Sequence, residues 1–202
     1  MTYSNTQVEF CCEHNRFIIG CIVTFLHDPF FWALVSMFAL VGGGVVLSHK
    51  KTGKHQLFGI IVVFLFVLGR GILVLPGCPQ PRFESGGWHW FVGGIIFIGG
   101  LVFSIPVFFI KPLTPPNEQM MLVTTGFYRI VRNPIYLGEV LWCLGWAIMF
   151  RSIIGVALVP LWWLALLLHT LVEEEMLKRA LGQPYINYAK KVRGRIIPGL
   201  PI

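Results

Sequence analysis

Residues 134–172 read PIYLGEVLWCLGWAIMFRSIIGVALVPLWWLALLLHTLV, two long apolar runs that meet around Arg151. Each run approaches the length that an α-helix needs to cross the hydrocarbon core of a bilayer. The connection between them is so short that the second helix must fold back along the first. This stretch therefore predicts an antiparallel helical hairpin in a membrane, with helices at about 134–150 and 152–172.

Three further apolar runs precede the hairpin, at about 29–48, 56–75 and 88–110. A shorter run at 17–26 cannot cross a bilayer, and we expect it to form an interfacial helix. Of the 202 residues, 55% are hydrophobic and only 12% are charged, whereas a soluble domain carries about 25% charged residues. The sequence thus predicts an all-α integral membrane protein with about five transmembrane helices, the last two forming the hairpin, and a cytoplasmic C-terminal helix.

The basic residues fall unequally on the two sides of these spans. Twelve lie in the loop between spans one and two, in the connection from span three to span four, and in the C-terminal tail, while three (Arg16, Arg82, Arg151) lie on the opposite side. Basic residues gather on the cytoplasmic side of membrane proteins, so we expect the tail to be cytoplasmic. The net charge of +7 is explained in this way, and nucleic-acid binding is not expected. The five cysteines form no CxxC pair, and neither a metal site nor a disulfide framework is predicted.

Three portions of the chain are predicted: an N-terminal interfacial segment (1–28), a three-helix membrane portion (29–116), and a portion with the last two spans and the tail (117–202). Glycines crowd two of the spans, in a run at 42–44 and in pairs at 93–94 and 99–100. Small residues let transmembrane helices approach closely. We therefore expect these glycines to pack helices together.

Polar residues concentrate in two stretches, 117–136 and 169–202. If the last transmembrane helix continues past the membrane, His169 and Glu173 lie four residues apart on one face, toward the turn at Arg132–Tyr136. The acid triplet Glu173–Glu175 could also be a solvated surface, and the arginines could bind lipid headgroups. From the residues alone, a site on the cytoplasmic face and a solvated surface are equally compatible with this pattern.

The same two stretches resemble a known family. The block LVTTGFYRIVRNPIYLG (122–138) resembles the signature G-x-Y-x-x-x-R-H-P-x-Y-x-G of membrane methyltransferases, and Glu173, Glu174 and Leu177, followed by Gly182, Tyr185 and Tyr188, resemble its second half. That family comprises the isoprenylcysteine carboxyl methyltransferases and the related phospholipid N-methyltransferases. The resemblance covers about 117–202, which is less than half of the chain.

The resemblance implies S-adenosylmethionine as methyl donor, bound at the cytoplasmic ends of the last two spans, and a lipid or lipidated acceptor that enters from the bilayer. His169 and Arg132 are the catalytic candidates of this sequence. Glu173 would bind the charged amino-acid end of the cofactor. The residues expected to contact the cofactor are Gln119, Met120, Met121, Leu122, Val123, Tyr128, Asn133, Pro134, Ile135, Tyr136, Glu173 and Glu174.

Two departures from the family pattern bear on the acceptor. Asn133 stands where the family commonly has histidine, and His169 stands where isoprenylcysteine enzymes have an arginine that would hold a carboxylate. A prenylcysteine-type carboxylate is the favoured acceptor, and because it is already ionised at neutral pH it needs no general base. A phospholipid amine is the main alternative. A membrane reductase using NADPH ranks third, and a non-enzymatic transporter or assembly factor is the alternative of another class.

Overall fold

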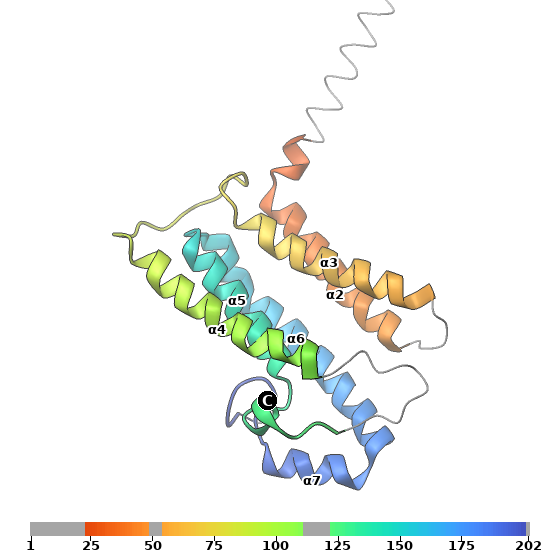
Figure 1. The fold of residues 1–202 in the computed structure, drawn as a ribbon. Helices are drawn as coiled ribbons and strands as arrows, with labels where there is room; N and C mark the ends of the chain where they lie inside the picture. Colours follow the sequence, from red (N-terminus) through yellow and green to blue (C-terminus); the bar gives the residue numbers. More distant parts are fainter. Residues whose placement is uncertain (1–22, 49–53, 111–121, 201–202) are drawn as a thin grey trace, which may run out of the picture. The chain divides into compact units, whose positions relative to one another are not determined.

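The computed structural model describes residues 23–48, 54–110 and 122–200, and these residues fold almost entirely into helices (Figure 1). The expectation of an all-α chain is confirmed for this part. Gln119, Met120 and Met121 lie outside the described residues, as does most of the short run at 17–26. The helices are α2 (Pro29–Ser48), α3 (Lys54–Leu73), α4 (Trp88–Ile110), the 3₁₀ turn η1 (Gly126–Arg129), α5 (Pro134–Met149), α6 (Ile153–Leu181) and α7 (Gln183–Lys191).

The chain forms two compact units, residues 1–80 and 81–202. In the first, α2 and α3 pack closely at Gly69, where an added Cβ would lie 2.7 Å from the Trp32 carbonyl oxygen. Arg70 is buried there, its Nε donating to the Phe66 carbonyl oxygen at 3.2 Å and its guanidinium lying 3.5 Å from the centre of the Phe66 ring. These contacts give this buried cation a structural role. The second unit holds α4 to α7.

The second unit is built on close contact between α4 and α5. A Cβ added at Gly93 would lie 2.8 Å from the Gly145 carbonyl oxygen, and one added at Gly100 would lie 2.8 Å from that of Gly138. Gly99, like Gly94, would meet no atom within 4 Å. Glycine therefore lets these two backbones touch at two levels, as small residues do between transmembrane helices.

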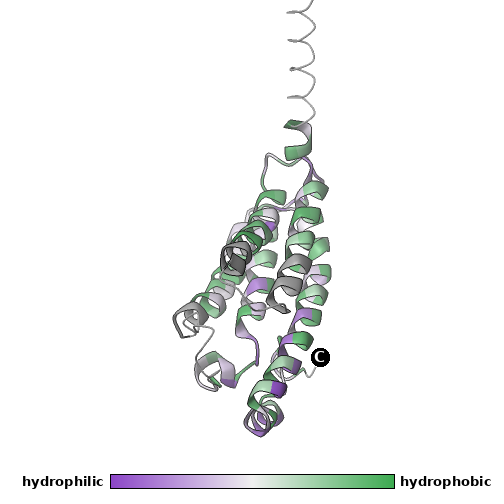
Figure 2. Ribbon diagram, turned by 90° about the vertical axis from the view of Figure 1, so that its right-hand side faces the viewer, coloured by the Kyte–Doolittle hydropathy of each residue, from purple (hydrophilic) through white to green (hydrophobic). Residues whose placement is uncertain are grey.

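The opposite face of α4 is apolar and exposed. Large exposed side chains recur there every three or four residues, and the most exposed of them, Phe91, is 73% exposed. The remaining members of this stripe are Ile95, Ile98, Val102 and Ile105. Figure 2 shows how apolar the helices are along most of their length. Such a stripe suits lipid rather than water.

Among the residues that the structure describes, two helices are long and apolar enough to cross a membrane, over Trp88–Ile105 and Ile153–Leu181. Shorter apolar helical stretches lie at Pro29–Leu40, Phe64–Leu73 and Pro134–Met149. Together with the exposed apolar faces, these helices identify a membrane protein.

A tight turn joins α5 to α6. Arg151 adopts a left-handed conformation with φ of 56°, and the Ser152 side chain accepts a hydrogen bond from the Gly155 N–H at 2.8 Å, which caps α6. Residues 81–83 close over this turn, since the Phe83 N–H donates to the Arg151 carbonyl oxygen at 3.1 Å and the Ile153 N–H to that of Pro81 at 3.2 Å. Arg82 and Arg151 thus lie at the same end of the unit.

The last long helix does not end near Val172 as predicted, because α6 continues nine residues further to Leu181. The apolar run stops at the acid triplet, but Glu, Leu, Lys, Arg and Ala are all strong helix formers. The helix ends only at Gly182, which adopts φ of 61°. This continuation carries Glu173 to Glu175 in helical geometry.

Candidate functional site

Three consecutive carboxylates on the extension of α6 have three different surroundings. Successive residues of an α-helix point about 100° apart, so each side chain meets another part of the protein. Glu174 is 2% exposed, Glu173 is half-buried, and Glu175 is exposed beside Lys178 and Arg179. Position on the helix, and not residue type, therefore distinguishes these acids.

Glu174 lies between two arginines. Its Oε1 is 3.0 Å from Nε of Arg132, and its Oε2 is 3.1 Å from Nε of Arg195. The Arg132 side chain is 8% exposed and that of Arg195 is 24% exposed. A carboxylate this deeply buried needs such partners to stay ionised. We call Arg132, Glu174 and Arg195 the ion triad.

The ion triad fastens the C-terminal tail to the turn before α5. The Arg132 N–H donates to the Gly194 carbonyl oxygen, and the Asn133 N–H to that of Arg195, both at 2.9 Å. The Asn133 amide also donates to the Arg195 carbonyl oxygen at 3.4 Å. Backbone and side-chain bonds thus hold residues 132–133 against 194–195.

A second cluster lies at the start of α5. The Tyr136 hydroxyl donates to Oε2 of Glu173 at 2.9 Å and lies 3.0 Å from Nδ1 of His169. A phenol carries one proton, which Glu173 accepts, so the His169 Nδ1–H must be the donor to the tyrosine oxygen. In neutral His169 this leaves Nε2 with a free lone pair. We call Tyr136, His169 and Glu173 the relay cluster.

Two tyrosines connect η1 to α7. The Tyr188 hydroxyl donates to the Tyr128 carbonyl oxygen at 2.7 Å. Burial, and then the neighbouring Tyr128, raise the pKa of Tyr188 to about 12. Burial and the Glu173 carboxylate likewise raise the pKa of Tyr128. Both phenols are therefore uncharged at neutral pH and act as hydrogen-bonding and packing groups.

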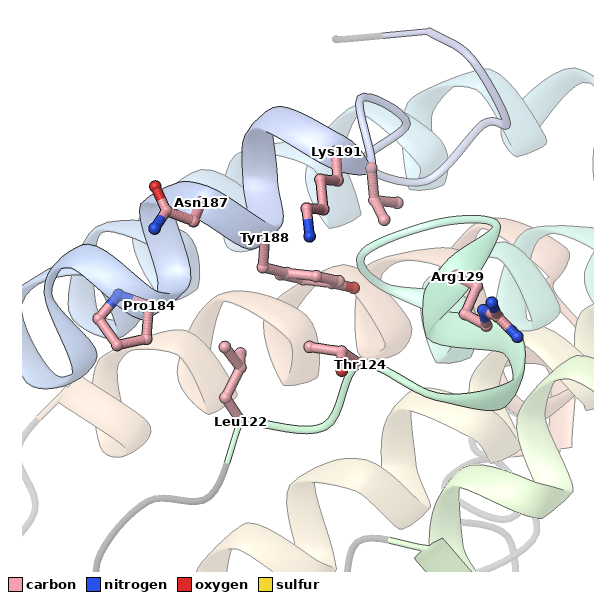
Figure 3. A pocket seen from close by; sticks show the side chains of 8 residues that line it. Leu122, Thr124, Arg129, Pro184, Asn187, Tyr188 and Lys191 are labelled. Carbon is pink, nitrogen blue, oxygen red and sulfur yellow. The ribbon is translucent and has the colours of Figure 1, made fainter.

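A cavity of about 460 Å³ opens between the segment before η1 and helix α7. Figure 3 shows Lys191 extending over the Tyr188 ring, with Leu122 and Thr124 on the other side of that ring. The remaining lining residues are Arg129, Pro184, Asn187 and Val192. The volume is within the range of small-molecule sites, about 300–1,000 Å³.

The structure brings together most of the described residues that the sequence singled out. Arg132 and Asn133 meet the tail, Pro134 begins α5, and Tyr136 contacts both His169 and Glu173. Leu122 lines the cavity. Tyr128 binds Tyr188 through its backbone, while Val123 and Ile135 are half-buried. Gln119, Met120 and Met121 lie in the part of the chain that the structure does not describe.

Sequence reasoning placed the C-terminal stretch at the site but did not single out the tail residues that contribute to it. Arg195 completes the ion triad, and Asn187, Lys191 and Val192 line the cavity. The tyrosines of α7 carried a signal, because Tyr185 and Tyr188 follow Gly182 in the family-like motif. Arg195 carried none, since one basic residue in a basic tail looks like its neighbours until the chain folds back.

The sequence was also compared with known proteins. A family described as phospholipid methyltransferase matches residues 88–184. Protein-S-isoprenylcysteine O-methyltransferase B of Arabidopsis thaliana is 26% identical over 161 residues, covering 73% of this chain and 76% of the relative. The A form from the same plant is 27% identical over 159 residues with the same coverages.

A relative from Schizosaccharomyces pombe, protein-S-isoprenylcysteine O-methyltransferase, is 34% identical over 77 residues, covering 38% of this chain and 33% of the relative. The family match begins where α4 begins and ends inside α7. It therefore includes Arg132 and Glu174 of the ion triad and the whole relay cluster. The chain is thus similar to protein-S-isoprenylcysteine O-methyltransferases over 73% of its length, and residues 88–184 match the phospholipid methyltransferase family.

Proposed function

We propose that this chain transfers a methyl group from S-adenosylmethionine to the α-carboxylate of a prenylcysteine-like lipidated acceptor. The observation that carries the proposal is the relay cluster, where a carboxylate, a phenol and an imidazole from two helices are joined by hydrogen bonds. The names of the relatives support the reaction class.

The residues present fit the proposed donor. S-adenosylmethionine, when bound, supplies an electrophilic methyl group on a sulfonium sulfur and carries an ammonium group that a carboxylate can hold. Glu173 is half-buried, and its carboxylate accepts a hydrogen bond from the Tyr136 hydroxyl. Carboxylate oxygens can accept several more, and charge-assisted hydrogen bonds are the strong ones. Glu173 is therefore the anchor that we propose for the ammonium group.

The other acid is unsuited to that task. Both oxygens of Glu174 are already taken by arginines, and its side chain is 2% exposed. A ligand would have to break a buried ion pair to reach it, which is expensive. In this proposal the ion triad positions the Asn133–Pro134 turn and the tail around the site, while the relay cluster binds ligand.

Methyl transfer to a carboxylate is a single displacement at carbon. The nucleophile is ionised at neutral pH, so the protein's tasks are alignment of the reacting groups and exclusion of water. Tyr136 fixes the His169 ring through its Nδ1–H and leaves Nε2 available. When protonated, His169 would present an N–H donor to the acceptor's carboxylate and so position it.

We also propose that five helices cross the membrane, with α5 and α6 as a hairpin and the site on the cytoplasmic face. The relay cluster and the turn containing Arg151 lie at opposite ends of α5 and α6, since Tyr136 meets His169 while the Ser152 N–H donates to the Ala147 carbonyl oxygen at 2.9 Å. Arg82 and Arg151 are at one end of the unit, and the basic tail is at the other. That asymmetry agrees with the distribution of basic residues in multi-pass proteins.

A second candidate is methylation of a phospholipid amine. The family match described as phospholipid methyltransferase favours it, and so does the free lone pair on Nε2 of neutral His169. An ammonium acceptor must lose a proton before it can attack, and an unprotonated imidazole nitrogen can take it. The two candidates differ in the chemistry of the product.

The test uses the full chain in detergent with S-adenosylmethionine labelled with tritium in the methyl group. N-acetyl-farnesyl-cysteine and phosphatidylethanolamine are offered separately. A methyl ester releases volatile labelled methanol on treatment with alkali, whereas an N-methyl amine does not. We expect alkali-labile label from the first acceptor, lost in Glu173→Gln and kept in Glu175→Gln. Label only on phosphatidylethanolamine would show that a phospholipid amine, and not a prenylcysteine carboxylate, is the acceptor. Label on neither compound would refute both candidate functions.

A further inference from the structure

The cavity beside Tyr188 differs in charge from the relay cluster. Its eight lining residues include two cations, Arg129 from η1 and Lys191 from α7, and no carboxylate. Neither cation has a hydrogen-bond or ion-pair partner among the residues that the structure describes. By contrast, Arg132, Arg195 and Arg179 are each paired with a glutamate. The two unpartnered cations therefore border one concavity.

This charge pattern is poorly matched to the proposed methyl donor. A sulfonium and an ammonium group would be repelled by Arg129 and Lys191, and they are matched instead by Glu173. An anion is the complementary ligand. Arginine binds phosphate oxygens through a planar fork and lysine as a point charge, and Thr124 and Asn187 add neutral hydrogen-bonding groups to the same wall.

We propose that this cavity binds a phosphate group, such as that of an anionic phospholipid, between Arg129 and Lys191. Leu122, Pro184 and Val192 supply the apolar part of the wall. The setting favours a lipid as the source, since Ile130 beside Arg129 is 47% exposed and Ile186 on α7 is 36% exposed. An apolar side chain next to an unpaired cation is typical of a segment at a membrane surface. The proposed phosphate binding goes beyond the proposed methyl transfer, and its test needs no methyl donor.

The experiment titrates dioctanoyl phosphatidylglycerol into the detergent-purified full chain and counts bound lipid by native mass spectrometry, without any methyl donor. Arg129→Gln/Lys191→Gln removes both cations of the cavity. The matched control, Lys190→Gln/Arg193→Gln, removes two exposed cations of the same tail that do not line it. We expect one saturable lipid, bound about thirtyfold more weakly by the first variant and within about threefold of the wild type by the control.

Equal weakening in both variants would mean general attraction of an anion to a basic tail, and it would overturn the proposal. So would unchanged binding in the first variant, or absence of saturable binding to the wild type. If the first variant does not fold, two measurements still decide. Arg129→Lys/Lys191→Arg should keep the lipid, and inorganic phosphate should displace it from the wild type at an ionic strength where chloride does not.

A further arm identifies the source of the phosphate. Dioctanoyl phosphatidylcholine carries the same phosphate beside a compensating cation, and we expect weaker binding than for phosphatidylglycerol. If inorganic phosphate binds as tightly as the lipid does, the site takes free phosphate; if the lipid binds more tightly, its glycerol and chains contribute. Either result supports a phosphate site, whereas failure of phosphate and of both lipids to bind refutes it.

Discussion

Glu173 and Glu174 are neighbours in sequence but belong to regions with opposite properties. The ion triad encloses Glu174 so that both of its oxygens face arginines at 3.0 and 3.1 Å. The relay cluster leaves Glu173 half-buried, with a tyrosine hydroxyl at 2.9 Å. The comparison shows how neighbouring acids of the same type take different roles. The enclosed Glu174 holds the structure together, and the more exposed Glu173 is the one that we propose binds a ligand.

The largest effect should come from Glu174→Gln. The change removes the negative charge between two buried or half-buried arginines and leaves them uncompensated, so we expect the free energy of unfolding to fall by about 3 to 5 kcal/mol. Denaturant unfolding in detergent measures it. Glu175→Gln is the matched control, since its partners are exposed, and it should change the value by less than about 1 kcal/mol. Similar losses in the two variants would abolish the distinction between these acids.

Replacing one arm of the triad should have a smaller effect. Arg195 is more exposed than Arg132, and Arg195→Gln leaves Glu174 with one arginine, so we expect a loss of about 1 to 3 kcal/mol. Arg193→Gln, an exposed cation two residues away, is the control. Limited proteolysis should cut the tail after residue 191 faster in Arg195→Gln only. Equal cutting in the two variants would show that Arg195 does not hold the tail.

Tyr136→Phe tests the relay cluster without changing a charge. The ring remains, but the hydroxyl that joins His169 to Glu173 is lost, and we expect the free energy of unfolding to fall by about 1 kcal/mol. Methyl transfer should fall more steeply than stability does, because the His169 tautomer is no longer fixed. The pH dependence of the rate checks this point. A rate reduced by the same factor at every pH would argue for a packing role only.

The smallest effect concerns Tyr188, which lies close enough to the triad for Glu174 to raise its pKa and Arg132 to lower it, both less than burial does. Its pKa is about 12 in the folded chain, against an ordinary value of about 10. The unfolded chain therefore loses this proton first, so the stabilisation is complete below pH 10 and is lost as the pH rises from 10 to 12. Tyr188→Phe should show a shallower decline of stability over that interval. An identical decline in the two proteins would mean that Tyr188 is not buried as described.

Much of the helical framework follows from the sequence. Pro134 starts α5 because proline fits the first turn of a helix, and the boundaries at Trp88 and Pro29 follow from apolar runs of sufficient length. The end of α6 does not follow, since the apolar run and the helix end at different residues. The glycines of α4 were also indistinguishable in sequence. Only the packed backbone reveals that Gly93 and Gly100 face α5 whereas Gly94 and Gly99 do not.

The candidate site could also be predicted only in part, because some of its contacts follow from local helical spacing and others form only when distant segments pack together. Helical spacing places His169 and Glu173 on one face, and their contact with Tyr136 agrees with that expectation. The contact between residues 132–133 and 194–195 is non-local and has no periodic signal. The contrast between Glu173 and Glu174 depends on that contact, so a motif of two acids could not show which one is enclosed and which one is more exposed.

The most direct test of the account is the affinity for S-adenosylmethionine, measured by isothermal titration calorimetry on the wild type, Glu173→Gln and Glu175→Gln. Loss of one charge-assisted hydrogen bond weakens binding by about ten- to a hundredfold. We expect Glu173→Gln to bind S-adenosylmethionine about ten- to a hundredfold more weakly, with a free energy of unfolding within about 1 kcal/mol of the wild type. We expect Glu175→Gln to bind it with unchanged affinity. Wild-type affinity in Glu173→Gln would contradict the account.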